Sequence, residues 1–271
     1  MPFSSTGLAY DRRPAGNPGS PQIVLIHAGV ADRRMWDPQW EALTDFDLTR
    51  VDLRGFGQST RPPIGGAFSH ADDVVAVMNE LGLDRPHVVG ASFGAGVAVE
   101  VALTEPQRVA SLVLAPPGGA LLSELTDDLR AFFAAERQAL ESGDVSAAAD
   151  ANIDAWVIGS GRSRDEVDGQ LVEKVRRMQL DAFAAASELG DVEADECDPP
   201  ALQRLEDVTV PTLIISGSHD MDTITAAARD LGARLPTAEC EVWPDTAHLP
   251  SLERPREFTR RLTEWLSSLD S

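Results

Sequence analysis

The sequence predicts an α/β protein, with a mostly parallel central sheet flanked by helices and a helical cap inserted into it. Short apolar runs alternate with helical patterns along much of the chain, which is typical of strands joined by crossover helices. Most of these runs are rich in Val, Ile or Leu at successive positions, as expected of parallel strands buried on both faces. A long stretch in which the alternation stops indicates the insertion.

Taken in order, the apolar runs predict strands over residues 22–27, 48–52, 87–90, 112–115, 212–216 and 240–243. Helical patterns between and after them predict helices over residues 35–43, 71–81, 93–104, 224–231 and 256–269. Pro106 falls just past the third of these helices and Pro255 just before the last, where proline is expected at helix boundaries.

The alternation stops after Ala115-Pro116-Pro117-Gly118-Gly119 and resumes at the strand that begins at Thr212. The stretch between is rich in Ala, Glu, Asp and Arg and is long enough for roughly three or four helices, whereas a crossover usually needs one. Such an insertion is expected to lie over the carboxyl ends of the strands, where open α/β sheets bind ligands. We therefore predict a core of residues 1–118 and 206–271 and a helical cap of residues 119–205.

Composition excludes several classes of function. The chain has 271 residues, of which 43% are hydrophobic, so it can bury a sizeable core. With 23 basic and 44 acidic residues its formal charge is −21, which disfavours binding to nucleic acid or to an anionic membrane. No apolar run is long enough to span a bilayer, and residues 1–20 lack the pattern of a signal peptide, so we expect a cytoplasmic protein.

The metal-binding residue types form no recognisable pattern. Cys197 and Cys240 are far apart and belong to no CxxC motif, and the five histidines include no HExxH pair. We expect neither a metal nor an organic cofactor.

The sharpest local motif is Gly90-Ala91-Ser92-Phe93-Gly94, in which a strand turns abruptly into a helix. The turn of a G-x-S-x-G motif brings the residues two before and two after the serine together, so both must be small. It presents the serine Oγ at a helix N-terminus, whose dipole favours developing negative charge. The motif predicts Ser92 as a nucleophile.

The same letters also fit the G-x-x-x-G-x-G turn of short-chain dehydrogenases. That turn normally follows the first strand, whereas here at least two strands precede it. Such enzymes also need a Tyr-x-x-x-Lys pair. Tyr10, the only tyrosine, is followed four residues later by Pro14, and Lys174, the only lysine, is preceded four residues earlier by Gln170. The absence of this pair argues against a nicotinamide enzyme.

A serine nucleophile needs a base that is itself oriented by an acid. His248 lies in a predicted loop between the last strand and the C-terminal helix, and Asp220 lies just past the strand that ends at residue 216. Asp222 and Asp245 are nearby alternatives for the acid. The order Ser92, Asp220, His248 differs from the order in either of the two classes of serine protease.

With these motifs in this order and at this spacing, the chain resembles the α/β-hydrolase-fold enzymes, which include carboxylesterases, enol-lactonases and carbon–carbon bond hydrolases. Two further segments carry the resemblance, Leu25-Ile26-His27-Ala28-Gly29 and Asp52-Leu53-Arg54-Gly55-Phe56-Gly57-Gln58-Ser59. The resemblance implies a catalytic triad of Ser92, Asp220 and His248. It also implies an oxyanion hole made by the backbone N–H groups of Gly29 and Phe93, with Val30 as an alternative to Gly29. The common form of the loop is His-Gly-x, so Ala28 is a departure that affects the path of this loop.

The resemblance implies a serine hydrolase that cleaves a small or medium carboxylic ester, thioester or lactone through an acyl-enzyme. A serine at the elbow disfavours haloalkane dehalogenases and epoxide hydrolases, which attack through aspartate there. Carbon–carbon hydrolases usually carry tryptophan after the catalytic histidine, where this chain has Leu249. The open alternatives are that branch, a biosynthetic acyltransferase or cyclase, and a non-catalytic ligand-binding protein. Several large apolar side chains of the cap could line a pocket, and none is assigned a role: Phe132, Phe133, Trp156, Met178 and Phe183.

Overall fold

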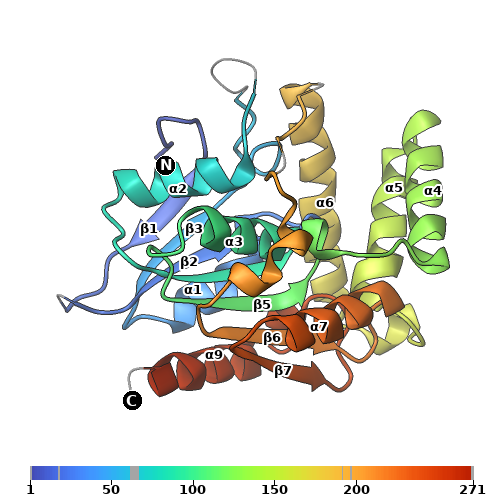
Figure 1. The fold of residues 1–271 in the computed structure, drawn as a ribbon. Helices are drawn as coiled ribbons and strands as arrows, with labels where there is room; N and C mark the ends of the chain where they lie inside the picture. Colours follow the sequence, from blue (N-terminus) through green and yellow to red (C-terminus); the bar gives the residue numbers. More distant parts are fainter. Residues whose placement is uncertain (1, 18, 62–66, 191, 196, 270–271) are drawn as a thin grey trace.

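The computed structural model describes residues 2–17, 19–61, 67–190, 192–195 and 197–269. Within these residues seven strands form one sheet in the order β1-β3-β2-β4-β5-β6-β7, in which only β1 is antiparallel to its neighbour. Helices cover both faces of the sheet (Figure 1). The predicted α/β class and mostly parallel sheet are confirmed.

The strands span β1 Tyr10–Arg13, β2 Gln22–Ile26, β3 Asp47–Val51, β4 His87–Ser92, β5 Ser111–Pro117, β6 Thr212–Gly217 and β7 Ala238–Trp243. The helices span α1 Asp37–Ala42, α2 His70–Glu80, α3 Phe93–Thr104, α4 Asp127–Glu141, α5 Val145–Asn152, α6 Gly169–Leu189, α7 Asp222–Arg234, α8 Pro250–Glu253 and α9 Pro255–Leu269. The helix predicted over residues 35–43 is a short 3-10 turn followed by α1.

Strand β1 was not predicted, because its sequence is polar. It lies at the edge of the sheet, where its side chains form ion pairs and do not need an apolar layer. Arg12 contacts Asp47 of β3 at 2.9 Å, and Asp11 contacts both Arg33 and Arg50 at 3.0 Å. Charged side chains therefore stabilise this edge strand in place of hydrophobic burial.

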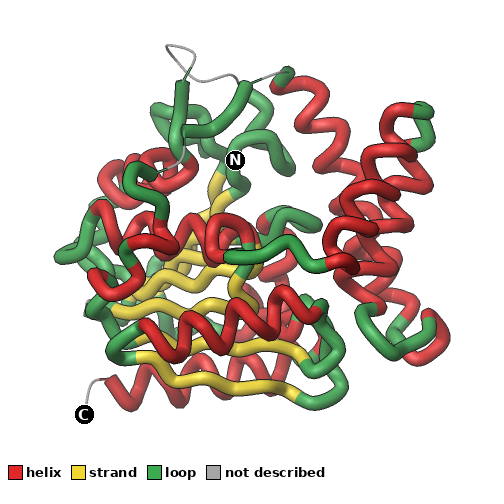
Figure 2. Tube along the Cα trace, turned by 45° about the vertical axis from the view of Figure 1, so that its right-hand side comes forward, coloured by secondary structure: helices red, strands yellow, loops and turns green. Residues whose placement is uncertain are grey.

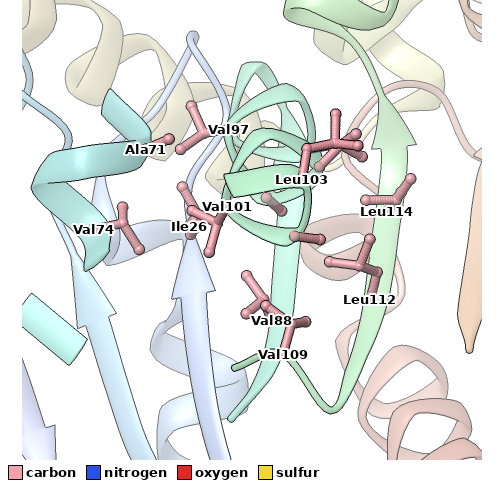
Figure 3. Packing of buried hydrophobic residues seen from close by; sticks show 14 of the residues in the cluster. Ile26, Ala71, Val74, Val88, Val97, Val101, Leu103, Val109, Leu112 and Leu114 are labelled. Carbon is pink, nitrogen blue, oxygen red and sulfur yellow. The ribbon is translucent and has the colours of Figure 1, made fainter. Parts of the chain in front are cut away.

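The two faces of the sheet bury separate apolar clusters. On one face α2 and α3 pack on the sheet, and the cluster includes Val74, Val101 and Leu112 (Figure 3). On the other face α9 packs with α1 and the preceding 3-10 turn, and the cluster includes Trp36 and Phe258. Helix α3 is buried along nearly its whole length, so the residue that precedes it is held on a rigid support.

A helical insertion made of α4, α5 and α6 separates β5 from β6, as predicted. It stands beyond the carboxyl ends of the strands (Figures 1 and 2). Helix α6 is tied to the core by Lys174, whose Nζ lies 3.0 Å from Asp37, and by Asp181, which lies 2.6 Å from Arg34. Residues 62–66 of the predicted core and 191 and 196 of the predicted cap lie outside the described residues. In the part of the chain that is described, no helix is long and apolar enough to cross a membrane.

Candidate active site

Ser92 ends β4 and immediately precedes α3, in a backbone conformation that only a tight turn imposes. Its φ of 53° lies in the left-handed region that non-glycine residues rarely adopt. A Cβ at Gly90 would lie 2.3 Å from the carbonyl oxygen of Gly94, and a Cβ at Gly94 would lie 2.4 Å from the carbonyl oxygen of His27. Both glycines are therefore required for the strand and helix to meet at this angle.

His248 lies between Ser92 and Asp220. Its Nε2 is 2.7 Å from Ser92 Oγ, and its Nδ1 is 2.9 and 2.7 Å from the two carboxylate oxygens of Asp220. A carboxylate can only accept, so Nδ1 carries the proton and Nε2 is left to accept from the serine hydroxyl. The side chains of His248 and Asp220 are 2% and 0% exposed, which shields the hydrogen bonds between these two side chains from water.

The structure distinguishes Asp220 from the two alternative acids. Asp222 is exposed at the first turn of α7. Asp245 has a side chain that is 82% exposed, and its carboxylate faces Arg254 at 3.4 Å. Neither carboxylate hydrogen bonds to His248, whereas Asp220 is anchored by a further bond from the N–H of Met221 to Oδ1 at 2.8 Å.

The backbone groups expected to form the oxyanion hole lie beside the serine. Gly29 and Phe93 both line the same cavity as Ser92, and a Cβ at Gly29 would lie 3.5 Å from the Cβ of Phe93. Phe93 is the first residue of α3, so its N–H is one of those that a helix leaves without an internal partner. Val30, the alternative donor, lines the cavity as well.

His27 fixes the loop that carries Gly29. Its Nε2 accepts from the N–H of Leu53 at 2.9 Å, and its Nδ1 donates to the carbonyl of Ala28 at 2.8 Å. The ring is fully buried, and this burial lowers the pKa of His27. A neutral His27 thus joins the loop after β2 to the loop after β3.

The insertion also contacts His248, which sequence reasoning did not anticipate. The ring of Trp156 lies 4.4 Å from the ring of His248, centroid to centroid, and its carbonyl accepts from the His248 N–H at 3.3 Å. Trp156 was identified as a pocket candidate only, and the sequence carries no signal for this tilted ring contact.

The loop around His248 is held by Glu253. Its Oε1 accepts from the N–H of Ala247 at 2.8 Å and from the N–H of Leu249 at 3.3 Å, on either side of the histidine. Its other oxygen pairs at 2.9 Å with Arg162, which follows the insertion's π-helical turn. Burial raises the pKa of Glu253, and Arg162 opposes that shift. Nothing in the sequence around Glu253 predicts this role.

A cavity of about 460 Å³ connects Ser92 and His248 with the insertion. Its walls are mostly apolar, and α4 and the segment before it supply many of them: Leu122, Leu125, Leu129, Phe132 and Phe133. Of the predicted pocket candidates, Phe132, Phe133 and Trp156 line it, whereas Met178 is buried in the apolar cluster around α9. Among the described residues, no group of three or more His, Cys, Asp or Glu side chains is arranged to hold a metal ion.

Three features together define the α/β-hydrolase class. They are a mostly parallel sheet, a serine in a strained turn between the fourth strand and a buried helix, and a histidine and an aspartate on later loops. Residues 21–255 match the alpha/beta hydrolase fold family, and the chain belongs to that family.

Individual relatives cover nearly the whole chain. A Bacillus subtilis (strain 168) protein assigned as a 2-succinyl-6-hydroxy-2,4-cyclohexadiene-1-carboxylate synthase is 27% identical over 98% of this chain and 97% of its own. A thermophilic esterase from Thermogutta terrifontis is 28% identical, covers 97% of this chain and 94% of its own, and superposes with a TM-score of 0.72. Est816, described as an N-acyl homoserine lactone degrading enzyme, is 26% identical over 95% and 96%, with a TM-score of 0.73.

Proposed function

We propose that this protein is a serine hydrolase that cleaves a small or medium carboxylic ester, thioester or lactone through an acyl-enzyme. The observation that carries the proposal is the unbroken series of hydrogen bonds from Ser92 Oγ through His248 to Asp220, beside a mostly apolar cavity that Ser92 and His248 line. Each member has the partner that its role requires.

In the proposed reaction, Ser92 Oγ attacks the substrate carbonyl carbon while its proton passes to His248 Nε2. The carbonyl oxygen becomes an oxyanion, which accepts from the N–H groups of Gly29 and Phe93. The C–O or C–S bond then breaks, and His248 donates its proton to the leaving group. Water, deprotonated by the same nitrogen, then attacks the acyl carbon. The bond from that carbon to Ser92 Oγ breaks, His248 returns the proton to Oγ, and the acid is released. Asp220 remains ionised and stabilises the imidazolium in both steps.

Two relatives support this substrate class, because one is an esterase and another degrades a lactone. We also propose that residues 119–205 act as a cap that selects substrates, since α4, α5 and α6 all contribute residues to the cavity that contains Ser92. A cap at this place excludes water from the developing oxyanion and fixes the size of the acyl or alcohol group that fits.

Labelling with a fluorophosphonate probe, followed by intact mass, tests the nucleophile. We expect one label on the parent protein and none on Ser92→Ala, together with a burst of 4-nitrophenol from 4-nitrophenyl butyrate. Equal labelling of the two proteins would show that Ser92 is not the nucleophile.

A biosynthetic reaction on the same serine is the second candidate, because one relative is assigned as a synthase. In its acyltransferase form, this candidate differs from a hydrolase in the group that accepts the acyl chain. When an alcohol is added to the reaction with 4-nitrophenyl butyrate, a hydrolase still gives mainly free butyric acid, because water is in large excess over the alcohol. An acyltransferase gives mainly the new ester, which gas chromatography distinguishes.

A further inference from the structure

The part of the cavity wall that the insertion supplies contains polar side chains that the proposed reaction does not use. Glu136 of α4, Asn152 of α5 and Gln179 of α6 line it together with Ser92 and His248. Helices α5 and α6 are linked nearby by Arg176, whose Nε donates to Asp150 at 3.0 Å, within about one helical turn of the two amides. Asn152 and Gln179 are each only 4% exposed.

Gln179 is a buried amide without a partner. Its Oε1 is buried and makes no hydrogen bond with the described residues, and no hydrogen bond from its Nε2 to them is found either. Native proteins almost always pair buried polar groups, since an unpaired one costs on the order of 1–3 kcal/mol. Oε1 is sealed from the cavity as well as from solvent, whereas Nε2 also lacks a partner among the described residues and is not fully buried. Because Gln179 lines the cavity, an acceptor on the substrate can bind Nε2.

The side-chain amide of Asn152 has a hydrogen-bonded nitrogen and an oxygen without a partner among the described residues. Its Nδ2 donates to Glu136 Oε1 at 2.5 Å and to the carbonyl of Ala148 at 3.0 Å. Both partners can only accept, so the nitrogen must face them, and Oδ1 is the remaining acceptor. Glu136 therefore orients Asn152 so that the side chain offers the cavity an acceptor.

We propose that Gln179 and Asn152 form a subsite for a secondary amide carried by the ester or lactone substrate. A secondary amide has one acceptor and one donor: its carbonyl accepts from Gln179 Nε2, and its N–H donates to Asn152 Oδ1. The apolar walls bind the carbon chain between this amide and the reacting carbonyl. The inference rests on the proposed hydrolase function and adds the chemical class of its substrate.

Two series of matched esters test the subsite. In the first, 4-nitrophenyl esters of N-acetyl-ω-amino acids are compared with 4-nitrophenyl alkanoates of equal length, in which two methylenes replace the amide. In the second, butyrates of N-acetyl amino alcohols are compared with butyrates of alkanols. We expect the parent protein to prefer the amide member of at least one pair by about tenfold in kcat/KM, the equivalent of one well-formed buried hydrogen bond.

The test variant is Gln179→Met, which keeps the length of the side chain and removes its polar atoms. We expect it to lose about tenfold in kcat/KM on the preferred amide ester and to stay within about twofold on the matching alkyl ester. The matched control is Gln170→Met, the same change at an exposed position of α6. It should leave both substrates unchanged.

The outcomes separate the subsite from the hydrolase itself. If the fluorophosphonate labels Ser92 but the parent shows no amide preference in either series, the subsite is refuted and the hydrolase stands. The same conclusion follows if Gln179→Met alters both members of a pair equally. If Ser92 is not labelled and no ester is cleaved, the proposed function fails. Because the preference is measured on the parent protein, the test does not depend on whether the variant folds.

Discussion

Replacing Asp220 by Asn should inactivate the enzyme by reversing the tautomer of His248. The N–H of Met221 donates to Asp220 Oδ1 at 2.8 Å, while Oδ2 lies 2.7 Å from His248 Nδ1. A backbone N–H can only donate, so the Asn oxygen must keep the Oδ1 position, which is 2.9 Å from Nδ1. The NH₂ then takes the Oδ2 position, which is the closer of the two to Nδ1 at 2.7 Å. Nδ1 then has to accept, and the ring proton moves to Nε2, which can no longer take the proton of Ser92.

The expected loss is large because the contact between Asp220 and His248 is buried. With the two side chains 0% and 2% exposed, no water can enter to relieve two opposed N–H groups. In the Ser-His-Asp template the same change lowers kcat by about 10⁴-fold, equivalent to about 5 kcal/mol of transition-state stabilisation. We therefore expect Asp220→Asn to retain about 10⁻⁴ of the parent kcat on 4-nitrophenyl butyrate.

The assay combines steady-state hydrolysis with the rate of fluorophosphonate labelling, since both depend on proton removal from Ser92. The matched control is Asp222→Asn, which removes the neighbouring carboxylate from an exposed position. It should stay within about twofold of the parent. A folded Asp220→Asn protein with more than a tenth of the parent kcat would refute the tautomer argument, as would an equal loss in Asp222→Asn.

Four other outcomes are expected. Ser92→Ala should keep the parent melting temperature and lose about 10⁴-fold or more in turnover, and a loss below tenfold would contradict a nucleophilic role. Gly94→Ala should lower the free energy of unfolding in urea by about 1–3 kcal/mol or more, because its Cβ would lie 2.4 and 2.6 Å from two backbone oxygens. The control Gly169→Ala should not, because no atom lies within 4 Å of the added Cβ. Burial lowers the pKa of His70 to about 4, so the unfolded state takes up a proton before the folded state does as the pH falls. The free energy of unfolding should therefore decrease between about pH 6.5 and 4, and the decrease should be smaller in His70→Gln. Phe133→Ala, on the cavity wall, should change the ranking of acyl chain lengths but not the labelling of Ser92, and an unchanged ranking would argue against a selective cap.

The parts of the fold that could be predicted are those with a local signature. Buried parallel strands are continuous apolar runs, so their positions follow from the sequence, and the nucleophile turn is specified by two glycines at fixed spacing. Strand β1 lacks an apolar run because ion pairs stabilise it. The choice among Asp220, Asp222 and Asp245 depended on which carboxylate the loop after β6 directs inward, which no local pattern encodes.

The less predictable residues are those whose partners are distant in the chain. Gln179 lies on an amphipathic helix, where a polar residue is expected to face water, and it is buried by tertiary packing that no local pattern indicates. Glu253 and Arg162 are 91 positions apart, and each is an ordinary charged residue in its own segment. The proposed triad follows from motifs, whereas the residues that support it and those proposed to contact the substrate are brought together only by tertiary structure.

The bond between Arg162 and Glu253 limits how modular the insertion is. Substrate specificity can be transferred between homologous enzymes of one fold by grafting the insertion of one protein onto the sheet of another. Here a graft joined at residues 119 and 205 would also replace Trp156 and Arg162, which touch the histidine and hold its loop. Chimaeras should therefore lose turnover along with the old specificity unless both contacts are rebuilt. Over evolution, substitutions in the insertion and substitutions in the loop around His248 are therefore expected to be correlated.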